Sequence, residues 1–430
     1  MKIKILSNQE KDFAANLENL IKDNSQTNHL AENDVKKIIN DVRNNGDEEI
    51  IKLCNKFDKS NFKSSDDLLV SEEEIDQAEN NLDKKTIKAL RTAFRRVINY
   101  HKKQLPKDLF FFDSNQNQLG NIWKPIEKVA IYVPGGTASY PSSVIMNAAV
   151  AIVAGCKEII MTTPSFQGKI DDAVLVAAKI CGIKTIYKVG GASAIAALAM
   201  GTKSINKVDK IVGPGNNYVA LAKKQLFGEV GIDMIAGPTD ILVIADRANN
   251  PDWIAADLLS QLEHGVDSKA ILICNCVDFA NSVEESLNNL SKNLTRISII
   301  EESIKKSALI VVDDLEKEGS EIANKIAPEH LEIITNNPEK ILNKIKNAGA
   351  VFLGKYSPEA IGDYIAGPSH TLPTEGTARF SSGLSVFDFL KRMSVISCSK
   401  QGFKYLQEDA ATLAASEGFD AHKLSITIRK

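Results

Sequence analysis

The chain has 430 residues, of which 43% are hydrophobic and 25% are charged, and its formal net charge at pH 7 is -3. This length predicts about two or three globular domains, and the lack of a basic excess argues against nucleic-acid binding. The N-terminus has no apolar signal-peptide core, and the longest apolar stretch, 144–155, is too short to span a bilayer. The six cysteines contain no CxxC pair, so we expect no disulfide framework, no thiolate zinc site and a cytoplasmic location.

Residues 1 to about 105 are predicted to be mainly helical, because apolar residues recur at helical spacing, for example at Ile87, Leu90, Phe94 and Val97. A region of strands begins at 109–113. From about 128 to 246, short β-branched runs alternate with longer apolar helices. The predicted strands are 129–133, 158–162, 184–189, 210–212 and 240–245, and the predicted helices lie near 141–155, 171–181, 192–201 and 217–227.

A second series of strands is predicted at 270–275, 308–312, 331–335 and 350–354, followed by a helical C-terminus. Alternating strands and helices predict parallel sheets that are covered on both faces. We therefore predict an α/β fold of two Rossmann-like lobes with parallel sheets, plus helical N- and C-terminal extensions. The predicted boundaries are 1–24 for an N-terminal helical arm, 25–128 with 238–383 for a first lobe, 129–237 for a second lobe, and 384–430 for a C-terminal helical tail.

Three glycine-rich joints, at 134–136, 190–191 and 213–216, each follow a predicted strand and precede a predicted helix. Free N–H groups and the helix dipole favour a phosphate at such positions. None of the joints completes G-x-G-x-x-G, since Tyr218 occupies the third glycine position after Gly213 and Gly215. The joints indicate a ligand crevice at the carboxyl ends of the strands. The alternative, that these glycines only turn the chain, stays open on spacing alone.

Four dispersed polar residues form a candidate metal set. Gln261 and His264 are three positions apart on a helical segment and project from one face. Asp363 lies in a loop rich in Gly and Pro, and His422 lies near the C-terminus. Two imidazoles, one carboxylate and one amide oxygen suit a divalent ion such as zinc. Spacing alone also allows packing roles for the histidines, and Glu263 is a rival ligand that points toward a different helix face.

Glu329 and His330 form a candidate catalytic pair directly before an apolar strand. Pro328 breaks the preceding helix, so the pair is predicted to occupy a turn at a strand end. Histidine titrates near neutrality and can take a proton from an alcohol, while a neighbouring carboxylate can orient or activate water. The dipeptide by itself also fits a surface pair that caps a turn.

These segments together resemble the histidinol dehydrogenase family. They occur in the family's order from about residue 129 to 422, whereas the helical N-terminal third matches only in general character. The matching segments are VAIYVPGGTASYPSSVIMNA, VGGASAIAALA, GPGNNYV, DMIAGPTDILVIAD, DLLSQLEHG, APEHLEI, GDYIAGPSHTLPT, FSSGLSVFDFLKR and SEGFDAH.

The resemblance implies a role for each matching position. The first lobe would carry most of the zinc and catalytic residues, and the second would bind NAD+. Glu329 and His330 correspond to the family's acid/base residues, and Glu417 to the carboxylate that meets the substrate's amine. Tyr132 and Asn216 correspond to cofactor contacts. The implied zinc ligands are Gln261, His264, Asp363 and His422. The implied substrate contacts are Thr239, Gln261, His264, His330, Asp363, Glu417 and His422.

Two positions depart from the family's pattern. Ser193 stands where many members have Gln, which shortens any hydrogen-bonding reach to NAD+. Thr239 stands where Ser is common, which keeps the hydroxyl and adds a methyl group. His370 lies in a matching segment without an assigned role beyond lining the pocket.

The implied reaction is the four-electron oxidation of L-histidinol to L-histidine through L-histidinaldehyde, with two NAD+ and one Zn2+ per subunit. It is the last step of L-histidine biosynthesis. The family's homodimer would take His422 and Glu417 of each site from the partner chain. The remaining alternatives are a dehydrogenase of a related amino alcohol and a non-catalytic zinc-binding relative.

The second oxidation needs a tetrahedral adduct of the aldehyde, either a hydrate or a thiohemiacetal on cysteine. Cys156 and Cys181 each end an apolar helix, where burial raises a thiol's pKa, and no cysteine has a motif with a base. The sequence therefore favours the hydrate route, in which Glu329 activates water and His330 deprotonates the hydrate.

Overall fold

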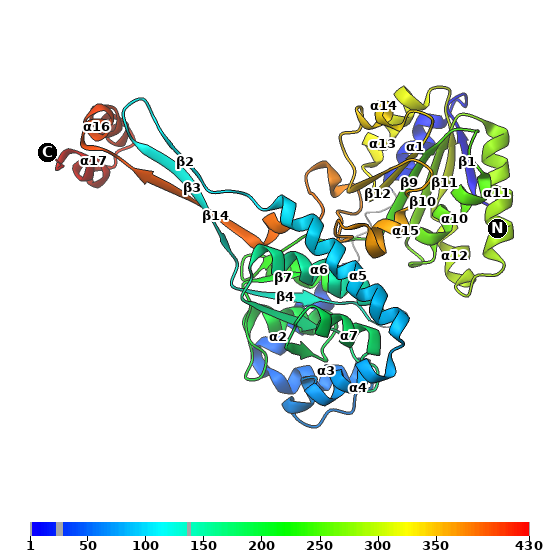
Figure 1. The fold of residues 1–430 in the computed structure, drawn as a ribbon, viewed down its shortest axis with the longest axis horizontal. Helices are drawn as coiled ribbons and strands as arrows, with labels where there is room; N and C mark the ends of the chain where they lie inside the picture. Colours follow the sequence, from blue (N-terminus) through cyan, green and yellow to red (C-terminus); the bar gives the residue numbers. More distant parts are fainter. Residues whose placement is uncertain (1, 23–28, 136–138, 430) are drawn as a thin grey trace.

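The computed structural model of the chain describes residues 2–22, 29–135 and 139–429. Within these ranges the strands form a six-stranded, a five-stranded and a three-stranded sheet. The two larger sheets are parallel and build two α/β lobes, and the third is a long arm (Figure 1). The predicted α/β fold with two parallel-sheet lobes is confirmed.

The first lobe is built on a six-stranded parallel sheet whose two central strands, DILVIA and KAILIC, are buried at every position. Continuous apolar runs of this kind form when both faces of a sheet are covered. The strand order is β1 (Lys4–Ser7), β11 (Ala308–Val311), β10 (Lys269–Cys274), β9 (Asp240–Ala245), β12 (His330–Ile334) and β13 (Ala350–Leu353). One face packs against α10 (Pro251–Leu262), α11 (Val277–Ser291) and α12 (Ile297–Ser303). The other packs against α1 (Phe13–Lys22), α13 (Ser320–Ile326) and α14 (Pro338–Leu342).

The second lobe is built on a five-stranded parallel sheet with a separate apolar core on each face. Its order is β6 (Thr185–Tyr187), β5 (Glu158–Thr162), β4 (Lys128–Tyr132), β7 (Lys210–Val212) and β8 (Gly231–Ile232). One face packs against α2 (His29–Asn45), α3 (Asp47–Phe57), α8 (Gly191–Met200) and α9 (Asn217–Leu226). The other packs against α4 (Glu72–Asn81), α5 (Lys84–His101), α6 (Pro141–Ala154) and α7 (Asp172–Ile180).

Two of the predicted boundaries need correction. Helices α2 to α5 were expected in the first lobe as part of 25–128, but their apolar residues, such as Val35 and Val97, lie in the cores of the second lobe. The N-terminal segment 1–24 is not only helical, because β1 adds an edge strand to the first-lobe sheet. Helical periodicity identifies a buried face but not the sheet that buries it.

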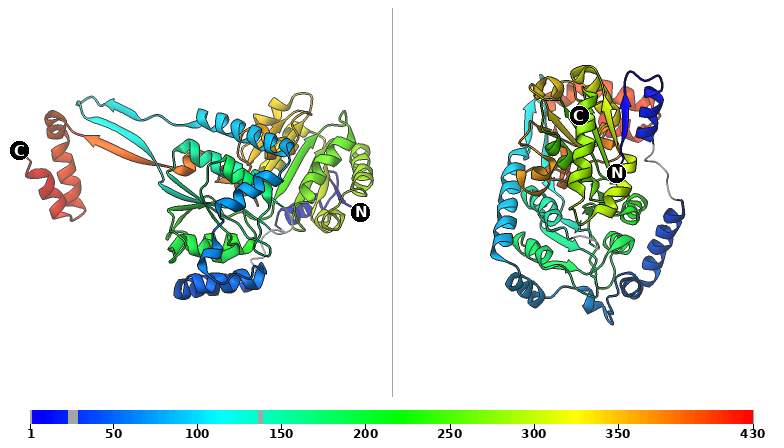
Figure 2. Two further views of the ribbon diagram at one scale, coloured as in Figure 1. Left: turned by 60° about the horizontal axis from the view of Figure 1, so that its bottom comes forward. Right: turned by 90° about the vertical axis from the view of Figure 1, so that its right-hand side faces the viewer.

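The arm is an antiparallel sheet in the order β14 (Leu390–Ser397), β3 (Gln118–Pro125) and β2 (Leu109–Phe112). Beyond β14 the chain forms α16 (Lys400–Ser416) and α17 (Asp420–Thr427) at the far end of the arm, away from both lobes (Figures 1 and 2). The predicted tail 384–430 is therefore α-helical only from Lys400, because a short 3-10 helix and β14 precede it. Strand β14 was not predicted from the sequence, because its partner strand β3 lies far away along the chain.

The remaining helical elements are short. None of the helices in the described ranges is long and apolar enough to cross a membrane. The short elements are η1 (Ser65–Leu68), η2 (Lys102–Gln104), η3 (Ile304–Lys306), η4 (Leu315–Gly319), α15 (Glu359–Ile361), η5 (Gly362–Ala366), η6 (Thr377–Arg379) and η7 (Val386–Phe389).

Candidate active site

The predicted catalytic pair lies in a tight turn between α13 and β12. After α13, Ala327 adopts the left-handed conformation with φ 53°, which reverses the chain before Pro328. His330 is the first residue of β12, at the amino end of the strand. The backbone N–H of Glu329 donates to Asp240 Oδ1 at 2.7 Å, which ties the turn to the start of β9. The sequence prediction of a turn at a strand end is confirmed.

The Glu329 carboxylate is buried beneath the start of β9. Its Oε2 accepts from Thr239 Oγ1 at 2.5 Å and from the backbone N–H of Asp240 at 3.3 Å. Burial raises the pKa of Glu329 to about 8, although attraction to His330 and the Thr239 hydrogen bond act in the opposite direction. The carboxyl group is therefore poised to exchange a proton near neutral pH.

The His330 imidazole has one nitrogen fixed and the other directed at carboxylates. Nδ1 lies 3.1 Å from the carbonyl oxygen of Asp240, and a carbonyl only accepts, so Nδ1 carries the proton of the neutral ring. Nε2 is buried without a hydrogen-bond partner among the described residues, and it lies 3.5 Å from Asp363 Oδ1 and 3.9 Å from Glu359 Oε1. Burial lowers the pKa of His330, but Glu329, Asp363 and Glu359 outweigh it and raise the pKa to about 10. In the neutral form of the ring, the lone pair that can accept a proton therefore lies on Nε2.

A candidate metal centre lies beside Nε2 of His330. His264, Glu359 and Asp363 each present a ligand atom, and these atoms lie within 4.8 Å of one another. His264 follows α10, Glu359 begins α15, and Asp363 lies in the π-helix η5. The backbone N–H of Glu359 donates to Glu332 Oε1 at 2.6 Å, so β12 also fixes the start of α15.

Glu359 was missed by the sequence interpretation. The available signal was its position one helical turn before Asp363, which places both carboxylates on one face.

Gln261 offers a further ligand atom of the kind a metal needs. Its side chain is fully buried, and Nε2 donates to Thr239 Oγ1, which in turn donates to Glu329. This fixes the amide orientation and leaves Oε1 without a hydrogen-bond partner among the described residues. A buried acceptor without a partner is costly unless something binds it. The amide oxygen, the imidazole of His264 and the two carboxylates fit a divalent cation such as zinc.

The predicted site residues from the C-terminus do not join this group within one chain. Glu417 and His422 are both exposed and belong to the α16–α17 unit at the end of the arm (Figure 1). The His422 ring lies 5.2 Å from the Phe419 ring, its neighbour on the arm. A single chain therefore gathers Gln261, His264, Glu329, His330 and Asp363, with Thr239 bridging Gln261 and Glu329, but not the last two predicted residues.

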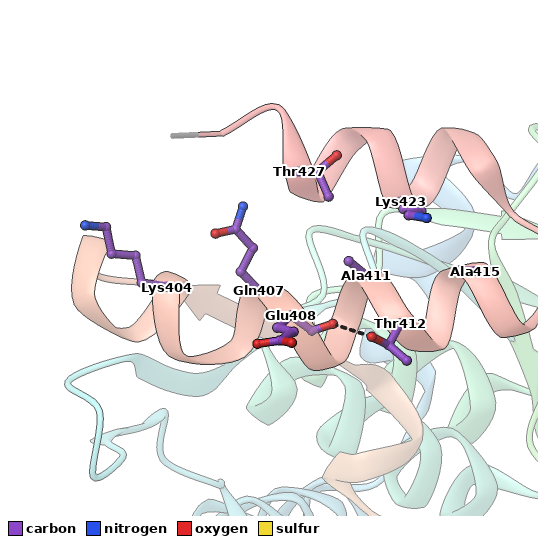
Figure 3. Close-up of a pocket in the computed structure, with 8 residues that line it drawn as sticks. All are labelled: Lys404, Gln407, Glu408, Ala411, Thr412, Ala415, Lys423 and Thr427. Carbon is purple, nitrogen blue, oxygen red and sulfur yellow. Dashed lines mark hydrogen bonds between the residues drawn. The ribbon is translucent and has the colours of Figure 1, made fainter.

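A groove on the arm lies between α16 and α17 (Figure 3). None of its lining residues belongs to the candidate active site, and these lining residues include no buried acid–base pair. Its lining residues are Lys404, Gln407, Glu408, Ala411, Thr412, Ala415, Lys423 and Thr427.

The residues expected to contact the cofactor lie at the carboxyl ends of second-lobe strands. Tyr132 ends β4, and its hydroxyl accepts from the backbone N–H of Gly191 at 3.1 Å. Asn216 caps α9, since its Oδ1 accepts from the Val219 N–H at 3.2 Å. Ser193 donates to the Gly190 carbonyl at 2.9 Å, so its side chain is used within its own turn.

The third glycine joint is held by a buried ion pair. Asp233 Oδ2 accepts from the backbone N–H of Gly213 at 2.7 Å, and Lys223 Nζ donates to the Gly213 carbonyl at 3.0 Å. Lys223 and Asp233 also pair with each other at 2% and 0% side-chain exposure. Gly213 has φ 114°, and a Cβ there would meet the Tyr132 carbonyl oxygen at 2.2 Å, so this position needs glycine.

Comparison with known proteins identifies the family. The family model described as histidinol dehydrogenase matches residues 21–430. A histidinol dehydrogenase of Carboxydothermus hydrogenoformans is 49% identical over 399 residues, covering 93% of each chain. One of Neisseria gonorrhoeae is 46% identical over 428 residues, covering 99% of this chain and 100% of the relative. A crystal structure of histidinol dehydrogenase from Elizabethkingia anophelis, 37% identical, superposes with a TM-score of 0.94 over 99% of this chain and 98% of the other. The chain therefore belongs to the histidinol dehydrogenase family of oxidoreductases.

Proposed function

We propose that the chain catalyses the zinc-dependent oxidation of L-histidinol to L-histidine through L-histidinaldehyde, with two NAD+, as the last step of L-histidine biosynthesis. The observation that carries this proposal is the buried Glu329–His330 pair. The Nε2 atom of His330 faces the group of His264, Glu359 and Asp363. The test is NADH formation from L-histidinol, with the zinc-loaded and the chelator-treated protein compared. Absence of NADH formation by fully zinc-loaded protein would refute the proposal.

The proposed zinc ligands are Gln261, His264, Asp363 and, from a partner chain, His422. The unpartnered Oε1 of Gln261 and the clustered ligand atoms support this assignment. Zinc held there would supply a fixed positive charge that positions the substrate's imidazole and amine. This charge would also partly offset the negative charge of the carboxylates, and so lower the His330 pKa that they raise. Glu359 lies among these ligand atoms and accepts from Ser260 Oγ at 3.1 Å, so it adds negative charge to the same centre.

In the first oxidation, His330 accepts the hydroxyl proton at Nε2 as the carbinol carbon loses hydride to NAD+. Its Nδ1–H bond to the Asp240 carbonyl keeps the lone pair on Nε2 and fixes the plane of the ring. The neighbouring carboxylates stabilise the imidazolium that forms. This arrangement lets one buried ring act as a base without moving.

In the second oxidation, Glu329 takes a proton from water as the water oxygen adds to the aldehyde carbon, and the aldehyde oxygen takes the proton held by His330. His330 then deprotonates the hydrate while hydride leaves to a second NAD+. Attraction to His330 lowers the pKa of Glu329, so protonation of the ring favours the carboxylate that the water step needs. The two residues thus have separable roles.

The cysteines support the hydrate route over a thiohemiacetal. Burial raises the pKa of Cys54 and Cys156 to about 12 and that of Cys274 to about 11, and it also raises the pKa of Cys181. Thiols of this kind form little thiolate near neutral pH and are weak nucleophiles. All six cysteines are unpaired, which agrees with the proposed cytoplasmic location.

The proposed cofactor site is formed by the glycine joints at 190–191 and 213–216 of the second lobe, beside Tyr132 and Asn216, while Gly136 of the joint at 134–136 lies outside the described residues. Helices α8 and α9 begin directly after two of these joints, so their N-termini offer N–H groups to a phosphate. Ser193 already donates to its own turn, so we assign no NAD+ contact to it.

We further propose a homodimer with shared active sites. All four residues of β2, LFFF, are exposed, and further apolar side chains are exposed on the arm helices. Exposed apolar surface of this extent marks an interface. A partner chain that covers it would also supply Glu417 and His422 to the site. The exposed apolar residues of α16, α17 and their junction are Tyr405, Leu406, Leu413, Phe419 and Leu424.

A further inference from the structure

The turn that carries Asp363 is held at its end by a helix of the other lobe. Arg96 lies on α5, which packs in the core of the second lobe, whereas η5 follows the last strand of the first-lobe sheet. The Arg96 guanidinium donates from Nε to the Ile365 carbonyl at 2.7 Å and from Nη2 to the Ala366 carbonyl at 2.9 Å. Carbonyls at a helix C-terminus lack intrahelical partners and attract a cation. The forked guanidinium therefore closes the end of η5.

The backbone after η5 is shaped for this close approach. Gly367 has φ 136°, and a Cβ at this position would lie 3.2 Å from the Tyr100 Cβ and 3.5 Å from the Arg96 carbonyl oxygen. Only glycine adopts this conformation without strain while leaving room for α5. The contact between α5 and the Asp363 turn is thus built into the backbone as well as the Arg96 side chain.

A second connection reaches the same turn from α6. His370 Nδ1 lies 3.0 Å from the Asp363 carbonyl oxygen, which only accepts, so Nδ1–H is the donor. His370 Nε2 lies 3.1 Å from Ser143 Oγ, so in the neutral ring the Ser143 hydroxyl donates to it. Ser143 is buried on α6, and one turn later Asn147 accepts from Thr371 Oγ1 at 3.3 Å. Helix α6 therefore contacts His370 and Thr371, which lie a few residues after η5.

We propose that Arg96 and the Ser143–His370 pair are positioning residues that hold Asp363 in the geometry for binding zinc. The proposal deepens the proposed function and rests on Asp363 being a zinc ligand. The π-helix η5 is a single turn of a rare conformation that is found frequently at functional sites. Hydrogen bonds behind a metal ligand typically control metal affinity by 10–100-fold. The metal centre of the first lobe therefore depends on the docking of α5 and α6 from the second.

The test measures the Kd of Zn2+ for metal-free full-length protein by competition with a chromophoric chelator. We expect Arg96→Met to raise this Kd by about tenfold or more, and Arg95→Met, at the exposed neighbour on the same helix, to leave it unchanged. Arg96→Lys should restore part of the affinity, since lysine keeps the charge but not the fork. The absorption spectrum of bound Co2+ should change in Arg96→Met, because it reports ligand geometry, while the thermal midpoint of the metal-free protein should not.

A double-mutant cycle tests the connection through α6. The amide of His370→Asn can still donate to the Asp363 carbonyl but does not reach Ser143, and Ser143→Ala removes the same contact from the other side. Both changes should raise the Kd of Zn2+. Because they remove the same contact, the Kd of the double variant should not exceed the higher of the two single-variant values. Wild-type Kd values in Arg96→Met and Ser143→Ala would overturn this proposal alone. Failure of the unaltered protein to bind Zn2+ would overturn the proposed metal centre as well.

Discussion

Two variants, His330→Asn and His422→Asn, each remove one half of the proposed active site, and together they test whether two chains share it. His330 begins β12 in the first lobe, while His422 lies on α17 at the far end of the arm (Figures 1 and 2). If the site is shared, both sites of the His330→Asn homodimer lack the base, and both sites of the His422→Asn homodimer lack a zinc ligand. Neither variant alone should oxidise L-histidinol at an appreciable rate.

A mixed dimer behaves differently because of this geometry. The body of the His422→Asn chain keeps His330 and receives an intact His422 from the other chain, so one site is complete, and the second site carries both changes. Random assembly of equal amounts gives about one half mixed dimers, each with one working site of two, so the mixture should show about one quarter of wild-type activity.

The assay co-expresses the two variants with different affinity tags and measures NADH formation by the doubly purified mixed dimer, which should reach about one half of wild-type activity. Each variant is co-expressed with a tagged copy of itself as the control. A mixed dimer as inactive as the two controls would refute the shared site, because it would mean that His330 and His422 act within one chain.

Three further predictions concern single substitutions. Glu329→Gln should lower L-histidine formation by about 10²–10⁴-fold, the usual contribution of a general acid or base, while the first NADH still forms. His330→Asn should impair both oxidation steps. An equal loss of rate in both steps of Glu329→Gln would argue against separate roles for the two residues. Lys223→Met should lower the free energy of unfolding in urea by about 3–5 kcal/mol, because its buried carboxylate partner loses its cation; Lys224→Met, at an exposed lysine, should change it by less than about 0.5 kcal/mol. Cys156→Ala should retain both oxidation steps in a stopped-flow NADH assay, and loss of the second step alone would favour a thiohemiacetal.

Most strands of the two parallel sheets could be predicted because they are short apolar runs rich in β-branched residues, but the edge strands β1 and β8 (Gly231–Ile232) were not predicted. The runs at 158–162 and 240–245, for example, correspond to β5 and β9 with the same bounds. Strand β14 could not be predicted, since its alternation is weak and its partner β3 is distant in sequence. Likewise, the periodicity of α2 and α5 gave their buried faces but not the lobe that they cover.

The candidate site divides in the same way. The types of side chain and the turn at Glu329–His330 follow from the sequence, because proline and an apolar run act locally. The inclusion of Glu359, the bridge from Gln261 through Thr239 to Glu329, and the support of Asp363 by Arg96 follow only from the tertiary structure. The contacts of Glu359, Gln261 and Thr239 lie within the first lobe, whereas Arg96 reaches across from the second. All of them join segments that are separate in the chain, so they arise from packing rather than from local preference. By itself, the sequence determined the chemistry that the chain carries, and the packing of the two lobes decided how that chemistry is held.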